Sequence, residues 1–331
     1  MTNPSVTRVL GTLTALLLLV FAGSLIVGAA SIPPSEVLRA LTGRSDATTT
    51  SIIIGLRLPR ALLALLVGGA LAASGVVFQA LLRNPLADPY VLGVSGGAAV
   101  GAVLAVVLGL AASHPWAVPI SAFVGGVGAI AIVLRIALAV GATLSARVFI
   151  LAGVVAAAFF NALILLFLSL ADAESFRSAI FWMMGSLSAA SWSQVTILAA
   201  YGAPSLVVLL ALARPLNLLS VGEETAAHLG VQVDSVKRWA YLVTSLLVAA
   251  AVAVAGVIGF VGLIVPHALR LLWGSDHRLL LPASVLGGAG FLLLTDTFAR
   301  TVVAPGELPT GVITALVGVP LFVMLLVRGD G

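Results

Sequence analysis

The sequence predicts an all-α, polytopic membrane protein with about ten transmembrane helices in a single domain over residues 1–331. Two observations lead to this prediction. Of the residues, 61% are hydrophobic and 8% are charged, whereas about 25% of the residues in a soluble domain are charged. Apolar runs of membrane-spanning length also follow one another along the whole chain. A chain with so little polar surface needs lipid as its solvent, which agrees with a mean hydropathy of +1.23.

The predicted spans are separated by proline, glycine and charged residues. The first span is longer than the apolar region of a signal peptide, so we expect it to stay uncleaved. The eighth is short, and only Gly256 and its neighbouring glycines separate it from the seventh. The spans cover residues 9–30, 61–82, 91–111, 117–140, 148–170, 193–213, 239–256, 258–272, 279–299 and 309–327.

The distribution of basic residues predicts the orientation. An even number of spans places both termini on one side, and a cytoplasmic N-terminus puts more of the arginines, together with Lys237, on the inside. We therefore expect both termini in the cytoplasm. The segment 31–56 then becomes an external loop with a short helix, and 214–238, the most polar stretch, becomes a cytoplasmic segment.

A weak internal repeat is also visible. At one constant spacing, Gly75 corresponds to Gly256, Pro85 to Pro266, and Gly93 to Gly274. If the unit is five spans, an odd number, the two halves are inverted relative to each other, as in many transporters. The abundance of glycine, 34 residues in all, could produce the same pattern.

Several classes of function lack their motifs. The single lysine, Lys237, is followed by Arg238, so no phosphate-binding P-loop exists in this chain. The chain contains no cysteine, and its four histidines are far apart, so we predict no metal site. The arginines are dispersed rather than clustered, which argues against a nucleic-acid partner.

Two classes of function stay open at this point. Residues 93–97 match the Gly-x-Ser-x-Gly pattern of serine hydrolases, but that pattern requires a strand before Ser95, and here a predicted span begins. An ion-coupled secondary transporter would need a carboxylate deep in the membrane. The acidic residues lie in predicted loops or near span ends, and the position of Asp296 is the least certain.

Two polar features interrupt the apolar pattern. Arg57 and Arg60 lie three residues apart around Pro59 at the start of the second span, and Arg300 follows the ninth span on the same side. Arginine is disfavoured outside the cell, so an external basic cluster predicts an acidic docking partner, with interfacial anchoring as the alternative. Asn161 is the lone amide of the fifth span, where helix packing and a pore-lining role are equally good interpretations.

These motifs together resemble the FecCD-type permeases of ABC importers for iron siderophores, haem and vitamin B12. The resemblance covers nearly the whole chain in the order of the family. Its blocks are residues 57–60, 79–89, 92–98, 181–187, 222–231, 259–267, 276–282 and 304–311.

The resemblance implies a pore-forming permease of the bacterial inner membrane that acts by alternating access. It implies a homodimer, two cytoplasmic ATPase subunits that bind ATP and Mg²⁺, and an extracytoplasmic substrate-binding protein. This chain would itself bind no cofactor and catalyse no reaction. The implied cargo is an iron chelate, siderophore or haem, with vitamin B12 as the alternative, and no residue selects among them.

The resemblance also assigns roles to residues. ATPase coupling falls on Gly222, Glu223, Glu224, His228, Leu229 and Gly230. Docking of the binding protein falls on Arg57, Arg60 and Arg300. The gate and translocation path fall on Asn84, Leu86, Thr143, Ser145 and Asn161.

Overall fold

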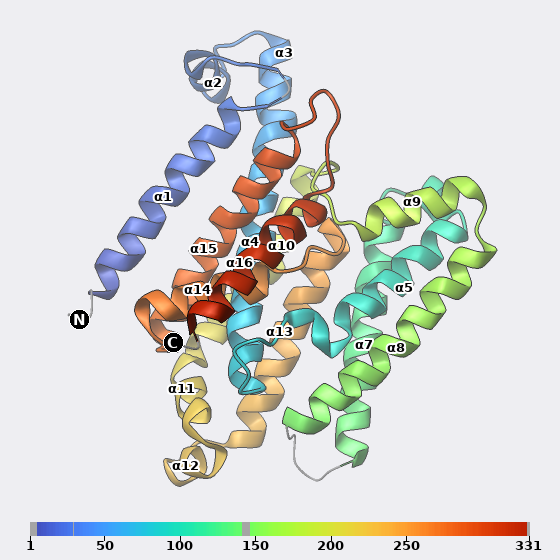
Figure 1. Cartoon of the computed structure of the whole chain (residues 1–331). Helices are drawn as coiled ribbons and strands as arrows, with labels where there is room; N and C mark the ends of the chain where they lie inside the picture. Colours follow the sequence, from blue (N-terminus) through green and yellow to red (C-terminus); the bar gives the residue numbers. More distant parts are fainter. Residues whose placement is uncertain (1–4, 29, 141–145, 330–331) are drawn as a thin grey trace.

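The computed structural model describes residues 5–28, 30–140 and 146–329, and in these ranges the chain is helical without a β-strand (Figure 1). Helices occupy the positions of all ten predicted spans, which confirms the predicted fold class. Seven are long and apolar enough to cross a membrane, α5 and α14 are shorter apolar helices, and α16 is apolar over Thr310–Met324. The ten are α1 (Val6–Ile26), α4 (Leu58–Leu81), α5 (Val94–Val107), α7 (Ala117–Val140), α8 (Ala146–Leu170), α10 (Trp192–Ala211), α13 (Val233–Ala255), α14 (Val261–Trp273), α15 (His277–Ala299) and α16 (Thr310–Gly329).

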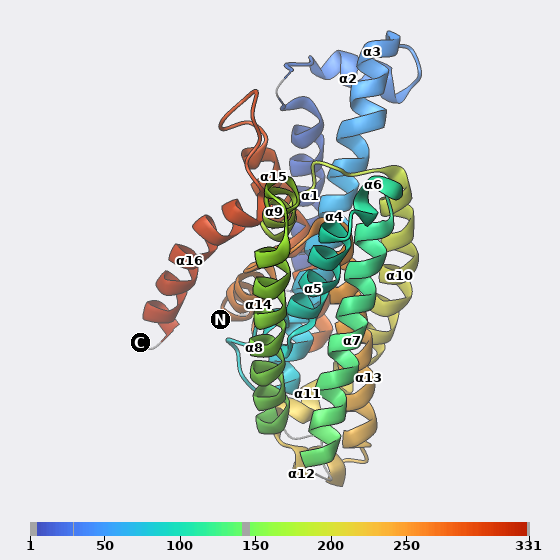
Figure 2. The same cartoon turned by 90° about the vertical axis from the view of Figure 1, so that its right-hand side faces the viewer.

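Short helices fill most of the connections. They include α2 (Pro34–Leu41), α3 (Ala47–Thr50), the π-helix η1 (Ser51–Arg57), the 3-10 helix η2 (Pro89–Leu92), α6 (Leu110–Ser113), α9 (Ala173–Met183), α11 (Ala213–Val221) and α12 (Glu223–His228). Figure 1 shows α2 and α3 at one end of the bundle and α12 at the other. The start of α1 and the end of α16 lie away from α2 and α3 (Figure 2).

The prediction that residues 31–56 form an external loop is wrong for the second half of this segment. The side chain of Asp46 accepts a hydrogen bond from the Thr49 amide at 2.9 Å and so caps the start of α3. From there α3, η1 and α4 form one continuous helical run, Ala47–Leu81. The second span therefore projects beyond the other helices at this end of the bundle (Figure 1).

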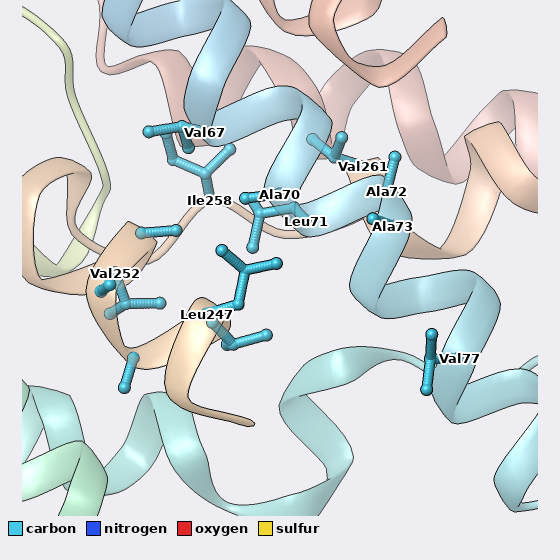
Figure 3. Close-up of a cluster of buried hydrophobic side chains, with 14 of the residues drawn as sticks. Val67, Ala70, Leu71, Ala72, Ala73, Val77, Leu247, Val252, Ile258 and Val261 are labelled. Carbon is cyan, nitrogen blue, oxygen red and sulfur yellow. The ribbon is translucent and has the colours of Figure 1, made fainter. Parts of the chain in front are cut away.

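The core of the bundle is built around α4, which packs against α15, α13, α14 and α10. Nearly every side chain from Pro59 to Ala80 is buried. In Figure 3, Val67 and Leu71 of α4 lie together with Leu247 of α13 and Ile258. The outer helices α1, α8 and α16 keep large apolar side chains exposed, as expected for surfaces that face lipid or a partner helix.

Glycines bring these helices into backbone contact. A Cβ on Gly68 would lie 2.3 Å from the carbonyl oxygen of Gly288 in α15, and one on Gly75 would lie 1.8 Å from that of Gly262 in α14. In α5, a Cβ on Gly101 would lie 2.0 Å from the carbonyl oxygen of Ser121 in α7. Such close approach stabilises helix pairs in lipid, where dispersion contacts replace the hydrophobic effect.

A break in the backbone separates the seventh and eighth spans, as the glycines predicted. Gly256 has a φ of +69° and Phe260 a φ of +70°, so the chain leaves the helical conformation between them. Polar groups of such a break must be satisfied inside the protein. The hydroxyl of Tyr90 donates to the carbonyl of Ile258 at 2.7 Å and accepts from its amide at 3.2 Å.

The residue correspondence that suggested an internal repeat is wrong. Gly75 lies in the middle of α4, whereas Gly256 ends α13. Pro85 lies in the connection after α4, whereas Pro266 lies inside α14. The matching letters therefore occupy different structural positions and give no support to an inverted five-helix repeat, which stays a prediction.

Candidate coupling, gating and docking sites

The polar segment predicted over 214–238 is helical rather than a loop. It consists of α11, α12 and the first turns of α13. Ala226 is buried and anchors α12, and Gly230, with a φ of +85°, turns the chain toward α13. Only glycine adopts that left-handed conformation without strain. The turn is closed by a hydrogen bond from the Val231 amide to the Ala226 carbonyl at 3.0 Å.

The residues assigned to coupling differ in exposure. Glu224, His228, Leu229 and Gly230 are exposed at this end of the bundle. Glu223 is partly buried, as is Gly222. Its carboxylate forms one ion pair with Arg83, at 3.0 Å, and a second with Lys237.

A second contact fixes α11 to the start of α15. The side chain of Asn217 donates to Asp276 at 2.6 Å and accepts from the His277 amide at 2.8 Å. Asp276 in turn caps α15 by accepting from the Arg278 amide at 3.0 Å. The Arg278 amide and the Asn217 side chain hold the pKa of Asp276 below its ordinary value.

The loop after α4 has a defined shape. The Asn84 side chain accepts a hydrogen bond from the Leu86 amide at 2.9 Å, an Asx turn, and both residues are exposed. Arg270 of α14 donates to Gln79 at 2.8 Å behind this loop. A cavity of about 280 Å³ lies beside Asn84 and is bordered by Arg83 and Arg270. The other proposed gate residues, Thr143 and Ser145, lie outside the described residues.

Asn161 lies on the exposed face of α8. The buried stripe of that helix runs through Phe160 and Ile164, whereas Asn161 shares its face with the exposed Val154 and Leu165. Packing inside one subunit therefore does not account for this amide. An amide in contact with lipid is unfavourable, so this face of α8 favours contact with another protein surface or with water.

Arg57, Arg60 and Arg300 come together at the end of the bundle opposite α12, but their side chains are buried. Arg57 donates to the carbonyls of Leu25 and Ile26 at 2.7 and 2.8 Å. Arg300 donates to the carbonyl of Ser24. These bonds tie the end of α1 to α4 and α15, so these two guanidinium groups hold the fold together.

Arg60 pairs with two carboxylates. Its Nε lies 3.0 Å from Oδ2 of Asp296, and its Nη1 lies 2.8 Å from Oε2 of Glu307. Asp296, which we expected near a span end, is 1% exposed inside the bundle. This carboxylate is already paired with Arg60, whereas an ion-coupled transporter would need an unpaired carboxylate at this depth.

The three arginines also line an opening. Together with Glu307 they border a cavity of about 320 Å³ at this end of the molecule. The predicted exposed cluster is thus a recessed pocket, whose accessible carboxylate is Glu307 with 41% of its side chain exposed. We did not predict Glu307 or Asp296 as partners of Arg60 because both lie more than 200 residues away in sequence, at a separation of 236 for Asp296 and 247 for Glu307.

The hydrolase pattern lacks its structural context. Ser95 lies in the first turn of α5 and is preceded by the 3-10 helix η2, not by a strand. Sequence reasoning also missed the pairing of Arg83 and Lys237 with Glu223. One indication of this pairing is present in the sequence, because the only lysine of the chain, Lys237, lies at the membrane edge of a predicted span and needs an acidic partner there.

An apolar helical bundle with a polar helical segment at one end and an arginine-lined pocket at the other defines the class of multi-pass transport permeases. Within that class the chain belongs to the FecCD transport family, whose pattern matches residues 16–328.

Curated relatives and a solved structure agree with this assignment. The chain is 41% identical to the hemin transport system permease protein of Yersinia pestis, over 96% of this chain and 95% of that one. It is 40% identical to the vitamin B12 import system permease protein of Klebsiella pneumoniae, over 96% and 93%. A metal-chelate type ABC transporter in an inward-facing conformation superposes with a TM-score of 0.86 at 35% identity, over 98% of this chain and 100% of that one.

Proposed function

We propose that this chain is the pore-forming subunit of an ATP-driven importer that carries an iron chelate, siderophore or haem, into the cytoplasm by alternating access. The observation that carries the proposal is the exposed surface of Glu224, His228, Leu229 and Gly230 on a FecCD-family bundle. Such a surface suits a cytoplasmic ATPase, which would bind the ATP and Mg²⁺. Vitamin B12 is the alternative cargo, because several relatives carry that name.

The proposed assembly contains two copies of this chain. The exposed face of α8 that carries Asn161 would line the path between them, which would remove the amide from lipid. Asn84 and Leu86, on the loop after α4, would form the inner gate, with Thr143 and Ser145 as further candidates. The chain would lie in the cytoplasmic membrane with α11, α12 and both termini on the cytoplasmic side, as the positive-inside rule favours.

Uptake into reconstituted vesicles tests the function directly. The vesicles contain this chain and its ATPase, with ATP on the side that the ATPase occupies and the binding protein on the other side. Ferric siderophore, haem and cobalamin are offered in turn, and we expect accumulation of a ferric chelate that depends on both ATP and the binding protein. Accumulation of cobalamin alone would replace the proposed cargo, and failure of any ATPase to associate would refute the importer proposal.

Docking of the binding protein is proposed at the arginine pocket. Because Arg57, Arg60 and Arg300 also hold the fold, substitutions at these residues would mix docking with folding. Glu307 offers a cleaner test, since its half-exposed carboxylate occupies the Nη1 of Arg60 that an acidic partner would use.

We expect Glu307→Gln to tighten the docking of an acidic binding protein by about two- to fivefold at low salt, the size of a partly exposed ion pair. The affinity is measured by surface-immobilised binding at two salt concentrations. The matched control is Glu36→Gln, which removes a partly exposed acid of α2 that pairs with Arg39, and it should change the affinity far less. Equal or weaker docking of Glu307→Gln would contradict the proposed docking site.

A further inference from the structure

Two adjacent glutamates at the start of α12 differ in exposure and in their contacts. Glu224 is exposed on the outer surface of the coupling segment, whereas Glu223 turns inward and uses both carboxylate oxygens. Its Oε1 lies 3.0 Å from Nη2 of Arg83, and its Oε2 contacts Nζ of Lys237. One side chain of α12 is thus bonded to the loop after α4 and to α13 at the same time.

The two ion pairs differ in strength. The side chain of Lys237 is 4% exposed, and a buried ammonium that loses its carboxylate partner is strongly unfavourable, so this contact keeps α12 and α13 together. The side chains of Arg83 and Glu223 are 41% and 35% exposed, and water competes for such a pair. The contact with Arg83 can therefore open and close while the contact with Lys237 persists.

Arg83 is placed to transmit a displacement. It directly precedes Asn84, and its φ of +48° is a left-handed conformation that a residue with a side chain adopts at a cost. The turn that follows is fixed by the hydrogen bond between Asn84 and the Leu86 amide. A shift of the Arg83 side chain thus acts on a short, internally bonded loop that carries the proposed gate residues Asn84 and Leu86.

We propose that Glu223 is a positioning residue that links the coupling segment to the gate loop from inside the permease, while Glu224 serves the ATPase surface. Glu223 moves with α12 and α13 and pulls or releases the gate loop through Arg83. This inference rests on the proposed function, because it assigns Glu223 a task within the importer cycle. It removes Glu223 from the residues expected to lie in the ATPase groove.

The test uses the full complex in vesicles and three readouts: co-purification of the ATPase, ATP hydrolysis, and chelate taken up per ATP hydrolysed. We expect Arg83→Gln and Glu223→Gln to lower the uptake per ATP by about two- to fivefold, the size of a half-exposed ion pair, and to leave co-purification unchanged. The double variant should be no worse than Glu223→Gln alone, because both changes break the same contact. Glu224→Gln should show the opposite pattern, with weaker co-purification.

A fourth readout follows the gate itself. The chain has no cysteine, so Leu86→Cys introduces a single thiol on the gate loop. We expect ATP to change its rate of maleimide labelling, and we expect Arg83→Gln to abolish that change. Arg83→Gln keeps the Glu223–Lys237 pair, so the labelling measurement on this variant stays informative even where Glu223→Gln folds poorly.

The outcomes separate the two proposals. A wild-type chain that associates with no ATPase refutes the proposed function. A wild-type complex that transports, with Glu223→Gln lowering co-purification as Glu224→Gln does, overturns the inference alone. The inference is also overturned by unchanged uptake per ATP in Arg83→Gln, or by effects of the two substitutions that multiply in the double variant.

Discussion

Replacement of Asp296 with alanine is expected to lower the free energy of unfolding by about 3–5 kcal/mol, because it strands a buried arginine. Asp296 is 1% exposed and accepts hydrogen bonds from Nε and Nη2 of Arg60 and from the hydroxyl of Thr310, each at about 3.0 Å. Thr310 opens α16, so the carboxylate joins α4, α15 and α16. The variant would leave only Glu307, at the rim of the pocket, to pair with Arg60.

The loss is measured by thermal and denaturant unfolding of the purified chain in detergent. Glu307→Ala is the matched control, since it removes the other carboxylate of the same arginine from a partly exposed position, and we expect a loss of about 1 kcal/mol or less. Arg60→Met combined with Asp296→Leu should recover most of the stability, because the only carboxylate that then loses its partner is Glu307, which is partly exposed to water. Equal effects of Asp296→Ala and Glu307→Ala would show that burial does not distinguish the two pairs.

Replacement of Gly75 with alanine is expected to destabilise the bundle by about 3 kcal/mol, at the upper end of the cost of overpacking. The added Cβ would lie 1.8 Å from the carbonyl oxygen of Gly262 and 2.6 Å from its carbon. These are backbone atoms of α14, so no side-chain rotation relieves the clash and α4 and α14 must separate. This separation would also disturb Gln79, which donates to the Gly262 carbonyl at 3.3 Å one turn further along α4.

Gly128→Ala in α7 is the matched control, because a Cβ at this position would meet no atom of a neighbouring helix within 4 Å. There the better helix propensity of alanine, worth about 1 kcal/mol relative to glycine, should leave stability unchanged or slightly raised. The two variants are compared by unfolding in detergent and by the yield of folded protein. A Gly75→Ala chain as stable as Gly128→Ala would mean that the helices are not held at this distance.

The sequence alone predicted the broad arrangement well. Runs of apolar residues located all ten helices, and glycines marked the break at Gly256. The motifs pointed to the family, and the polarity of 214–238 drew attention to α11 and α12. These features succeed because hydropathy and helix breaking are local properties, fixed by neighbours in the chain.

Local patterns also misled where two interpretations share the same residues. The sequence predicts a loop over the second half of 31–56 because this stretch begins with polar residues. One of them, Asp46, caps a helix that continues into α4. The spaced glycines and prolines imitated a repeat, although Gly75 serves helix contact and Gly256 serves a turn. Composition counts residues without showing which task each one performs.

What the sequence by itself determined is the solvent of this protein, the positions of its membrane helices and its family. Only the tertiary structure decided which charges meet: that Arg60 is neutralised by Asp296 and Glu307, and that Glu223 turns inward to Arg83 and Lys237 while Glu224 stays outside. The physical reason is that an ion pair depends on distance in space and on burial. Partners that lie 236 residues apart leave no mark on the local pattern around either of them.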